Sequence, residues 1–253
     1  MIAHTLPSIW LLLVSFAAIT LAYAIFALAG FGSVFITAPA LAQMMPLSIV
    51  VPVLALVDCG AATLNGWKLG RKIVLRELVL LIPLMIAGSY LGAKALLVLP
   101  ARPMMIALGV FVIVYALQAL LWVPGEARIG RGWVIPIGAL GGIFSGMFGS
   151  GGFIYAMYLT RRLADKDEMR ATQSALIGLS TLTRAVIFFA AGLYTDLNNL
   201  LFAVACLPAM ALGTWLGHRV TLTMSREQFL KTIHSLLIVS GGALLVRGLM
   251  LPR

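Results

Sequence analysis

Arg184 and Asp58 are the ionisable residues that most suggest chemistry, because each lies about midway along a long apolar segment. In a bilayer, an ionised group at that depth costs at least about 2.5 to 3.5 kcal/mol, so each side chain should face a partner or an aqueous cavity. An arginine there can attract an anion, and the carboxylate can serve as its resting counter-ion or as a proton carrier. A purely structural ion pair between the two residues is the alternative.

Two glycine-rich breaks interrupt the apolar segments. They are Gly30, Phe31, Gly32 and Ser33, and Phe148, Gly149, Ser150, Gly151 and Gly152. A helix that restarts after such a break presents unpaired backbone N–H groups and the positive end of its dipole, which suit an anion. The two serines add hydroxyl donors at equivalent positions. We predict that these residues bind substrate together with Arg184; the alternative is that the glycines only allow close helix packing.

Other polar residues of the segments that carry Asp58 and Arg184 are candidates for lining the same cavity. They are Asn65, Gln173, Ser174 and Ser180. Most hydroxyl side chains in membrane helices bond instead to backbone or to neighbouring helices, which is the competing interpretation.

Motifs for enzymatic or metal chemistry are absent from the sequence. No Ser lies in a G-x-S-x-G frame, and no Walker loop, dinucleotide fingerprint or H-E-x-x-H pattern occurs. His4, His218 and His234 are isolated from one another. Cys59 and Cys206 lie in apolar segments without a partner at metal-ligand spacing, and we interpret both as packing residues. We therefore expect no enzymatic activity, no metal and no cofactor.

The composition predicts where these residues lie. Of the 253 residues, 62% are hydrophobic and 10% are charged, whereas globular domains carry about 25% charged residues. Residues 1–57 contain no Asp, Glu, Lys or Arg, and about 20 apolar residues cross a bilayer. The net charge of +10 falls in short clusters between apolar runs, which favours a multi-pass protein of the cytoplasmic membrane over a nucleic-acid partner. The charged run 161–170 is predicted to be a solvated loop.

Residue matches between the two parts of the chain indicate an internal duplication. The tripeptide at 31–33 reappears at 148–150. The series Pro83, Gly88, Ser89, Gly92 and Lys94 reappears with identical spacing as Pro208, Gly213, Thr214, Gly217 and Arg219. We predict one transmembrane domain, 1–253, built from a first repeat at 1–123 and a second at 132–253.

Segment lengths predict how each repeat crosses the membrane. The first contains apolar segments at 9–29, 34–45, 48–66, 74–97 and 103–122, and the second at 134–148, 153–163, 171–191, 197–218 and 228–250. The segments of about a dozen residues reach only about halfway across, at about 1.5 Å per residue. We predict an all-α protein in which each repeat is a broken, re-entrant-like helix pair plus three transmembrane helices. Three is odd, so the repeats are inverted; eight plain spans with kinks at the breaks are the alternative.

The glycine-rich segments resemble a known family. Ala29-Gly30-Phe31-Gly32-Ser33 with Pro39, and the run from Gly141 to Gly152, are similar to the paired signatures of the TauE/SafE family of sulfite-exporter-like membrane proteins. The resemblance covers nearly the whole chain, although Ser33-Val34 replaces further glycines and the second half has no proline corresponding to Pro39. It implies a cytoplasmic-membrane transporter for sulfite, organosulfonates or related sulfur-containing anions, without a cofactor.

Three functional classes follow from these observations. A secondary transporter of a small anion explains the breaks, the buried arginine and the duplication together. A passive anion channel could use the same residues, and in a non-transporting membrane scaffold the pair of Asp58 and Arg184 would be purely structural. Nothing in the sequence favours import over export or indicates an oligomeric state.

Overall fold

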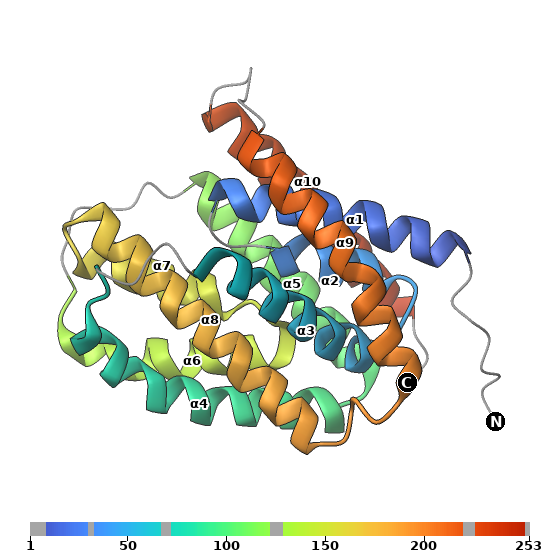
Figure 1. The fold of residues 1–253 in the computed structure, drawn as a ribbon, viewed down its shortest axis with the longest axis horizontal. Coiled ribbons are helices and arrows are strands. Elements are labelled where there is room, and N and C mark those ends of the chain that lie inside the picture. The colour runs from blue at the N-terminus through green and yellow to red at the C-terminus, as the bar shows by residue number, and fades with distance from the viewer. Residues whose placement is uncertain (1–8, 30–32, 67–71, 122–128, 220–225, 251–253) are drawn as a thin grey trace.

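The protein is a bundle of α-helices without a β-strand among the residues described. The structure is a computed structural model, and it describes residues 9–29, 33–66, 72–121, 129–219 and 226–250 (Figure 1). The first half contains α1 (Ile9–Ala29), α2 (Ser33–Ala42), α3 (Leu47–Gly66), α4 (Leu75–Val98) and α5 (Ala101–Leu121). After a 3-10 turn at Arg131–Trp133 follow α6 (Val134–Phe148), α7 (Gly151–Arg162), α8 (Lys166–Ala190), α9 (Leu197–Arg219) and α10 (Arg226–Met250). The predicted all-α class is confirmed.

The bundle is built for a bilayer. Helices α4, α5, α8 and α9 are long and apolar enough to cross a membrane, and α1, α2, α3 and α10 contain shorter apolar stretches. Large apolar side chains on several helices point outward, among them Val79, Val98, Phe189, Val204 and Val239, each more than half exposed. Soluble proteins rarely expose so much apolar surface, whereas lipid requires it.

The charged run 161–170 is mostly helical, so the prediction of a loop there was wrong. Asp165 is the N-cap of α8, and its Oδ1 accepts from the backbone N–H groups of Asp167 at 2.7 Å and Glu168 at 3.2 Å. These backbone hydrogen bonds hold the pKa of Asp165 below its ordinary value. An aspartate cap followed by acidic residues favours a helix start, which places residues 166–170 in the first turns of α8.

The repeated glycines are where helices of different halves pack. On α4, a Cβ at Gly88 would lie 2.9 Å from the backbone nitrogen of Ile143 on α6. On α9, a Cβ at the matching residue, Gly213, would lie 3.0 Å from the backbone of Thr20 on α1. The fourth helix of each half therefore packs on the first helix of the other (Figure 1).

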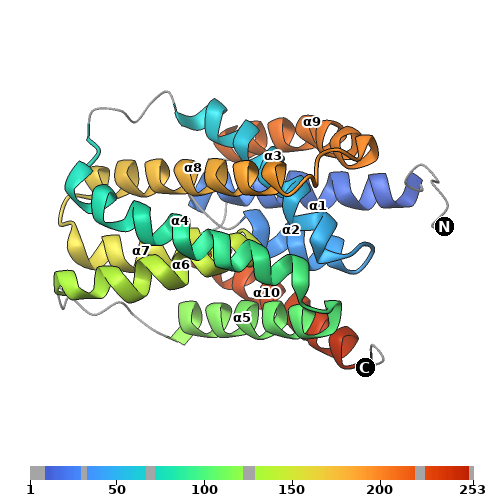
Figure 2. The same cartoon turned by 90° about the horizontal axis from the view of Figure 1, so that it is seen from below.

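Two further helix pairs also join one half of the chain to the other. Helix α3 packs on α8, and α5 packs on α10, each pair joining corresponding helices of the two halves (Figure 2). A two-fold relation between the halves would produce this set of contacts. The inverted orientation of the repeats stays a prediction.

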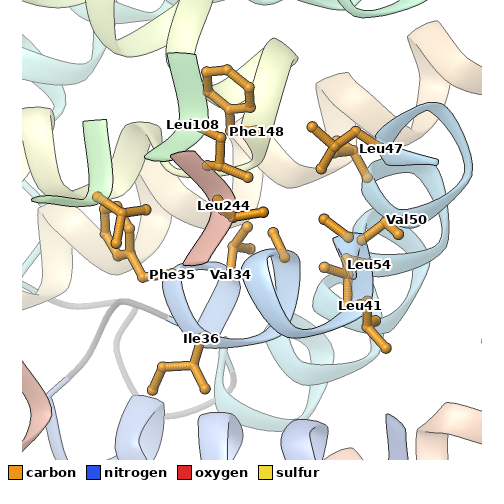
Figure 3. Packing of buried hydrophobic residues seen from close by; sticks show 14 of the residues in the cluster. Val34, Phe35, Ile36, Leu41, Leu47, Val50, Leu54, Leu108, Phe148 and Leu244 are labelled. Atoms are coloured by element: carbon orange, nitrogen blue, oxygen red, sulfur yellow. The ribbon is translucent and has the colours of Figure 1, made fainter. Parts of the chain in front are cut away.

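Helix α2 lies at the centre of the bundle. Nine of its ten residues are buried, and Figure 3 shows side chains gathered around it from α3, α5, α6 and α10. Leu54, Leu108, Phe148 and Leu244 are representatives of these four helices. A helix that is apolar on all sides has to be buried. Its first residue, Ser33, is thereby held inside the protein.

Candidate functional site

Asp58 and Arg184 form an ion pair inside the bundle. Arg184 Nη2 on α8 lies 3.1 Å from Asp58 Oδ2 on α3, and the two side chains are 2% and 12% exposed. The predicted pairing is present. Because α3 and α8 occupy corresponding places in the two halves, the pair lies where the halves meet.

Two hydroxyl groups complete the surroundings of Asp58. Tyr23 on α1 donates to Asp58 Oδ1, and Ser33 Oγ at the start of α2 donates to the same oxygen at 3.3 Å. The carboxylate therefore accepts from residues of three helices. Sequence reasoning identified Ser33 and missed Tyr23; the available signal was a tyrosine inside an otherwise apolar, charge-free segment.

Arg184 retains donors that no protein group uses. Its Nη2 also reaches Thr181 Oγ1 at 3.4 Å, but Nε and Nη1 are buried and have no hydrogen-bond partner among the described residues. A buried donor without a partner costs about 1–3 kcal/mol, more for a charged group. The guanidinium thus has capacity for a further acceptor.

The unpartnered Nη1 lies at the second glycine break. A Cβ added to Gly149 would collide with Arg184 Nη1 and would lie 3.1 Å from a methyl group of Val34. Val34 is the first residue after the first break. The structure therefore brings the end of the first break, the second break and the buried arginine to one place.

The second break turns the chain back sharply. Gly149 has a φ of 77°, and its backbone N–H donates to Ser145 O, so α6 ends in a left-handed (αL) cap; Ser150 N–H also donates back to Phe144 O. Gly151, which begins α7, then lies against Gly141 and Ser145. Ten residues of continuous helix span about 15 Å, so this contact requires a hairpin and excludes a kinked single helix for α6 and α7.

The start of α7 offers backbone donors beside Arg184. Ser150, the N-cap residue, makes no side-chain cap, and its hydroxyl donates only to Phe144 O at 3.5 Å. The first backbone N–H groups of a helix have no partner within the helix. A Cβ at Gly152 would lie 3.0 Å from Ile177 on α8, so the start of α7 is held between α6 and α8.

The predicted cavity-lining residues fall into different environments. Ser180 Oγ lies 2.6 Å from Ser145 Oγ, and both serines are buried. Gln173 is buried on the same helix, while its neighbour Ser174 is exposed. Gly30, Phe31 and Gly32 lie outside the described residues, as does the side chain of Asn65. Phe148 is fully buried and packs on Phe144 and Phe111.

A second buried carboxylate lies away from the break. Glu77, near the start of α4, accepts from Tyr158 Oη at 2.7 Å and from Arg162 Nε at 3.0 Å. Sequence reasoning missed this cluster, although an acidic residue at the edge of an apolar segment was a usable signal. Unlike Arg184, Arg162 is partly exposed, at 23%. Across the described residues, no three His, Cys, Asp or Glu side chains are grouped so as to hold a metal ion.

Comparison with known proteins places the chain in a family. The family described as "Sulfite exporter TauE/SafE" matches residues 15–244. The chain belongs to this family. One relative of this TauE/SafE protein, the "Probable inner membrane transporter protein TsaS" of Comamonas testosteroni, is 26% identical over 187 residues, which cover 74% of this chain and 78% of the relative. No solved structure matches the chain. Membership of TauE/SafE and the apolar helices together make this a multi-pass membrane protein of a transporter family.

Proposed function

We propose that the protein is a secondary transporter of a small anion in the cytoplasmic membrane. The observation that carries this proposal is the buried Arg184, whose Nε and Nη1 have no partner among the residues that the structure describes and whose Nη1 faces the backbone at Gly149. A group that is costly to bury and incompletely paired points to an anion as its further partner.

The start of α7 would hold the anion from a second side. Its unpaired backbone N–H groups and the helix dipole favour negative charge, and Arg184 supplies a full positive charge next to them. Small oxyanions have several acceptor oxygens and can bind backbone and guanidinium donors at the same time. Ser150 and the residues that begin α7 are accordingly the proposed substrate-binding group, together with Arg184.

A sulfur oxyanion or a sulfonate is the proposed substrate class. The family description names sulfite, and a sulfonate presents the same three-oxygen face. The site joins elements of both halves, which is the place where transporters built from repeats with broken helices bind their substrates.

Flux measurements on purified protein in liposomes test this function. We expect radiolabelled sulfite and methanesulfonate to enter at a saturable rate and to exchange with unlabelled anion on the other side. A rate that never saturates, without exchange, would indicate a channel. If folded protein transports none of the anions tested, the proposal is contradicted, and a non-transporting membrane scaffold becomes the remaining functional class.

A further inference from the structure

The proposed anion and Asp58 bind to the same guanidinium. Arg184 donates from Nη2 to Asp58, and its Nε and Nη1 have no partner in the described part of the chain, so an arriving anion shares or replaces this carboxylate. The inference below rests on the proposed function and concerns the charge balance of that site.

The buried charges at the site sum to zero before substrate arrives. Asp58 contributes one negative charge and Arg184 one positive charge, and Arg184 is the only fully buried Lys or Arg among the described residues. A monovalent anion would leave one uncompensated negative charge in a low-dielectric interior, which costs several kcal/mol. One proton restores neutrality, and Asp58 is the carboxylate that can accept it.

We propose that Asp58 takes up one proton when Arg184 binds a monovalent anion, so that anion and proton cross the membrane together. The proton comes from water on the side where substrate enters and adds to a carboxylate oxygen of Asp58. It returns to water on the other side when the anion leaves and the ion pair forms again. No net charge moves in one such cycle.

The neighbours of Asp58 can satisfy its neutral form. The hydroxyls of Tyr23 and Ser33, which donate to the carboxylate, can also accept a hydrogen bond, so a protonated Asp58 keeps partners after Arg184 turns to the anion. The guanidinium cannot accept a hydrogen bond, and the anion then replaces Asp58 as its charged partner, beside the Thr181 hydroxyl. Asp58 therefore keeps hydrogen-bond partners in both protonation states, and the guanidinium gains an acceptor when the anion binds.

Other titratable groups near Asp58 are neutral at physiological pH. They are Tyr23, which donates to Asp58, and Cys59, the chain neighbour of Asp58; farther out on the surrounding elements follow Cys206 of α9, in the apolar cluster of Tyr23, and Tyr194, whose hydroxyl donates to Pro52 O. The charges that act on Tyr23 and Cys59 come from Asp58 and Arg184. Asp58 is thus the carboxylate of this cluster and the group that carries the proton in the proposed cycle.

The coupling has a definite sign. A proton on Asp58 releases Arg184 and promotes anion binding, and by reciprocity a bound anion promotes protonation. Joint binding gives symport, which imports the anion when protons are more active outside the cell. Antiport would require proton and anion to exclude each other. The direction inferred here differs from the export named in the family description.

Glu77 provides a matched control within the same protein. It too is buried and bonded to a tyrosine and an arginine, Tyr158 and Arg162. Its arginine is partly exposed and lies at the end of α7 opposite the glycine break. A loss of coupling that is specific to Asp58 should therefore not occur when Glu77 is changed.

The test uses proteoliposomes with a pH-sensitive dye inside and methanesulfonate as the probe, because this anion keeps a single charge near neutral pH whereas sulfite titrates. With acid outside, we expect methanesulfonate to accumulate above its external concentration while the interior acidifies. A protonophore should abolish accumulation, and a potassium diffusion potential should leave the rate unchanged. Flux without proton movement, or flux driven by the potential, would overturn the inference while leaving anion transport intact.

Variants locate the proton. Asp58→Asn imitates the protonated residue, so we expect it to exchange labelled for unlabelled methanesulfonate but to lose accumulation driven by the pH gradient. Glu77→Gln should retain both. Accumulation by Asp58→Asn at the wild-type level would refute the proposal, and so would the loss of both activities in folded Asp58→Asn. If Asp58→Asn does not fold, the dye and potential measurements on the wild-type protein decide alone. Absence of any anion flux in the wild-type protein would contradict the proposed function itself.

Discussion

Nη1 of Arg184 lies directly against the backbone of Gly149. This relationship joins the one fully buried arginine of the described chain to a glycine with a φ of 77°. The glycine is required twice, once by its left-handed backbone and once by the space that the guanidinium occupies. A substitution at residue 149 therefore probes the candidate site directly.

Gly149→Ala should abolish most anion flux. The methyl group would displace the guanidinium, and the left-handed conformation adds about 1–2 kcal/mol for a residue with a Cβ. Gly192→Ala is the matched control, because Gly192 has nearly the same φ, 76°, with no atom within 4 Å of a Cβ. Both variants place a Cβ on a left-handed backbone, but only Gly149→Ala brings that Cβ into contact with Arg184. Equal flux per folded molecule in the two variants would contradict the role given to Gly149.

Arg184→Lys should reduce flux by at least about tenfold, since a hydrogen bond to a charged group is worth about 1.5–3 kcal/mol. Lysine keeps the charge and can reach Asp58, but it has a single nitrogen and loses the planar arrangement of donors. The control is Thr183→Val, which removes a hydroxyl that bonds only to Leu179 O of its own helix. Full activity of Arg184→Lys would assign Arg184 a structural role only.

Ser150→Ala should have a mild effect, about twofold in flux, as expected for about 0.5 kcal/mol. The Ser150 hydroxyl makes one long hydrogen bond, to Phe144 O, and caps no backbone group of α7. The backbone N–H groups at the start of α7 remain in the variant. Saturation curves measured beside the wild-type protein check this expectation. A loss as large as that of Arg184→Lys would make the hydroxyl, rather than the backbone, the main donor.

Sulfate should compete poorly with methanesulfonate. The two anions resemble each other in size and oxygen geometry, but sulfate carries two negative charges, and the site balances one with Arg184. Inhibition of labelled methanesulfonate uptake by each unlabelled anion measures the difference. Equal inhibition by sulfate would show that charge is balanced by groups other than this pair.

Gly92→Ala and Gly242→Ala should change thermal stability in opposite directions. A Cβ at Gly92 would enter the backbone of α6 at Ile143, 2.9 Å from its carbonyl carbon, whereas a Cβ at Gly242 on α10 meets nothing within 4 Å. Replacing an unobstructed helical glycine by alanine stabilises by roughly 0.5–1 kcal/mol. Melting of the detergent-solubilised variants checks the sign of each change. A rise of Tm for Gly92→Ala would contradict the close packing of α4 on α6.

The helices could be predicted from the sequence because hydropathy and the two breaks mark them directly. The predicted segments 9–29 and 134–148 coincide with α1 and α6. The predicted segment 171–191 begins five residues after the start of α8, because Asp165 caps the helix and the charged residues after it form its first turns. Local hydrogen bonding by one side chain decided that boundary.

The candidate site was predictable only in part, because sequence spacing does not show which face of a helix meets which neighbour. Asp58 and Arg184 could be paired because an ionised group in lipid needs a partner. Gln173 and Ser174 looked equivalent, yet one is buried and the other exposed. Tyr23 and Glu77 acquire their importance from contacts with helices distant in the chain, which the sequence does not reveal.

The exchanged packing of α4 on α6 and α9 on α1 bears on how the protein is made. While the first half is being synthesised, the glycines of α4 that contact α6 have no partner helix yet. In the same way, α1 cannot pack on α9 until α9 has entered the membrane. Neither half can complete its own packing. The early helices must therefore stay able to shift relative to one another in the membrane until translation ends. Two genes, each encoding one half, should therefore restore the protein when expressed in the same cell, whereas either fragment alone should be degraded.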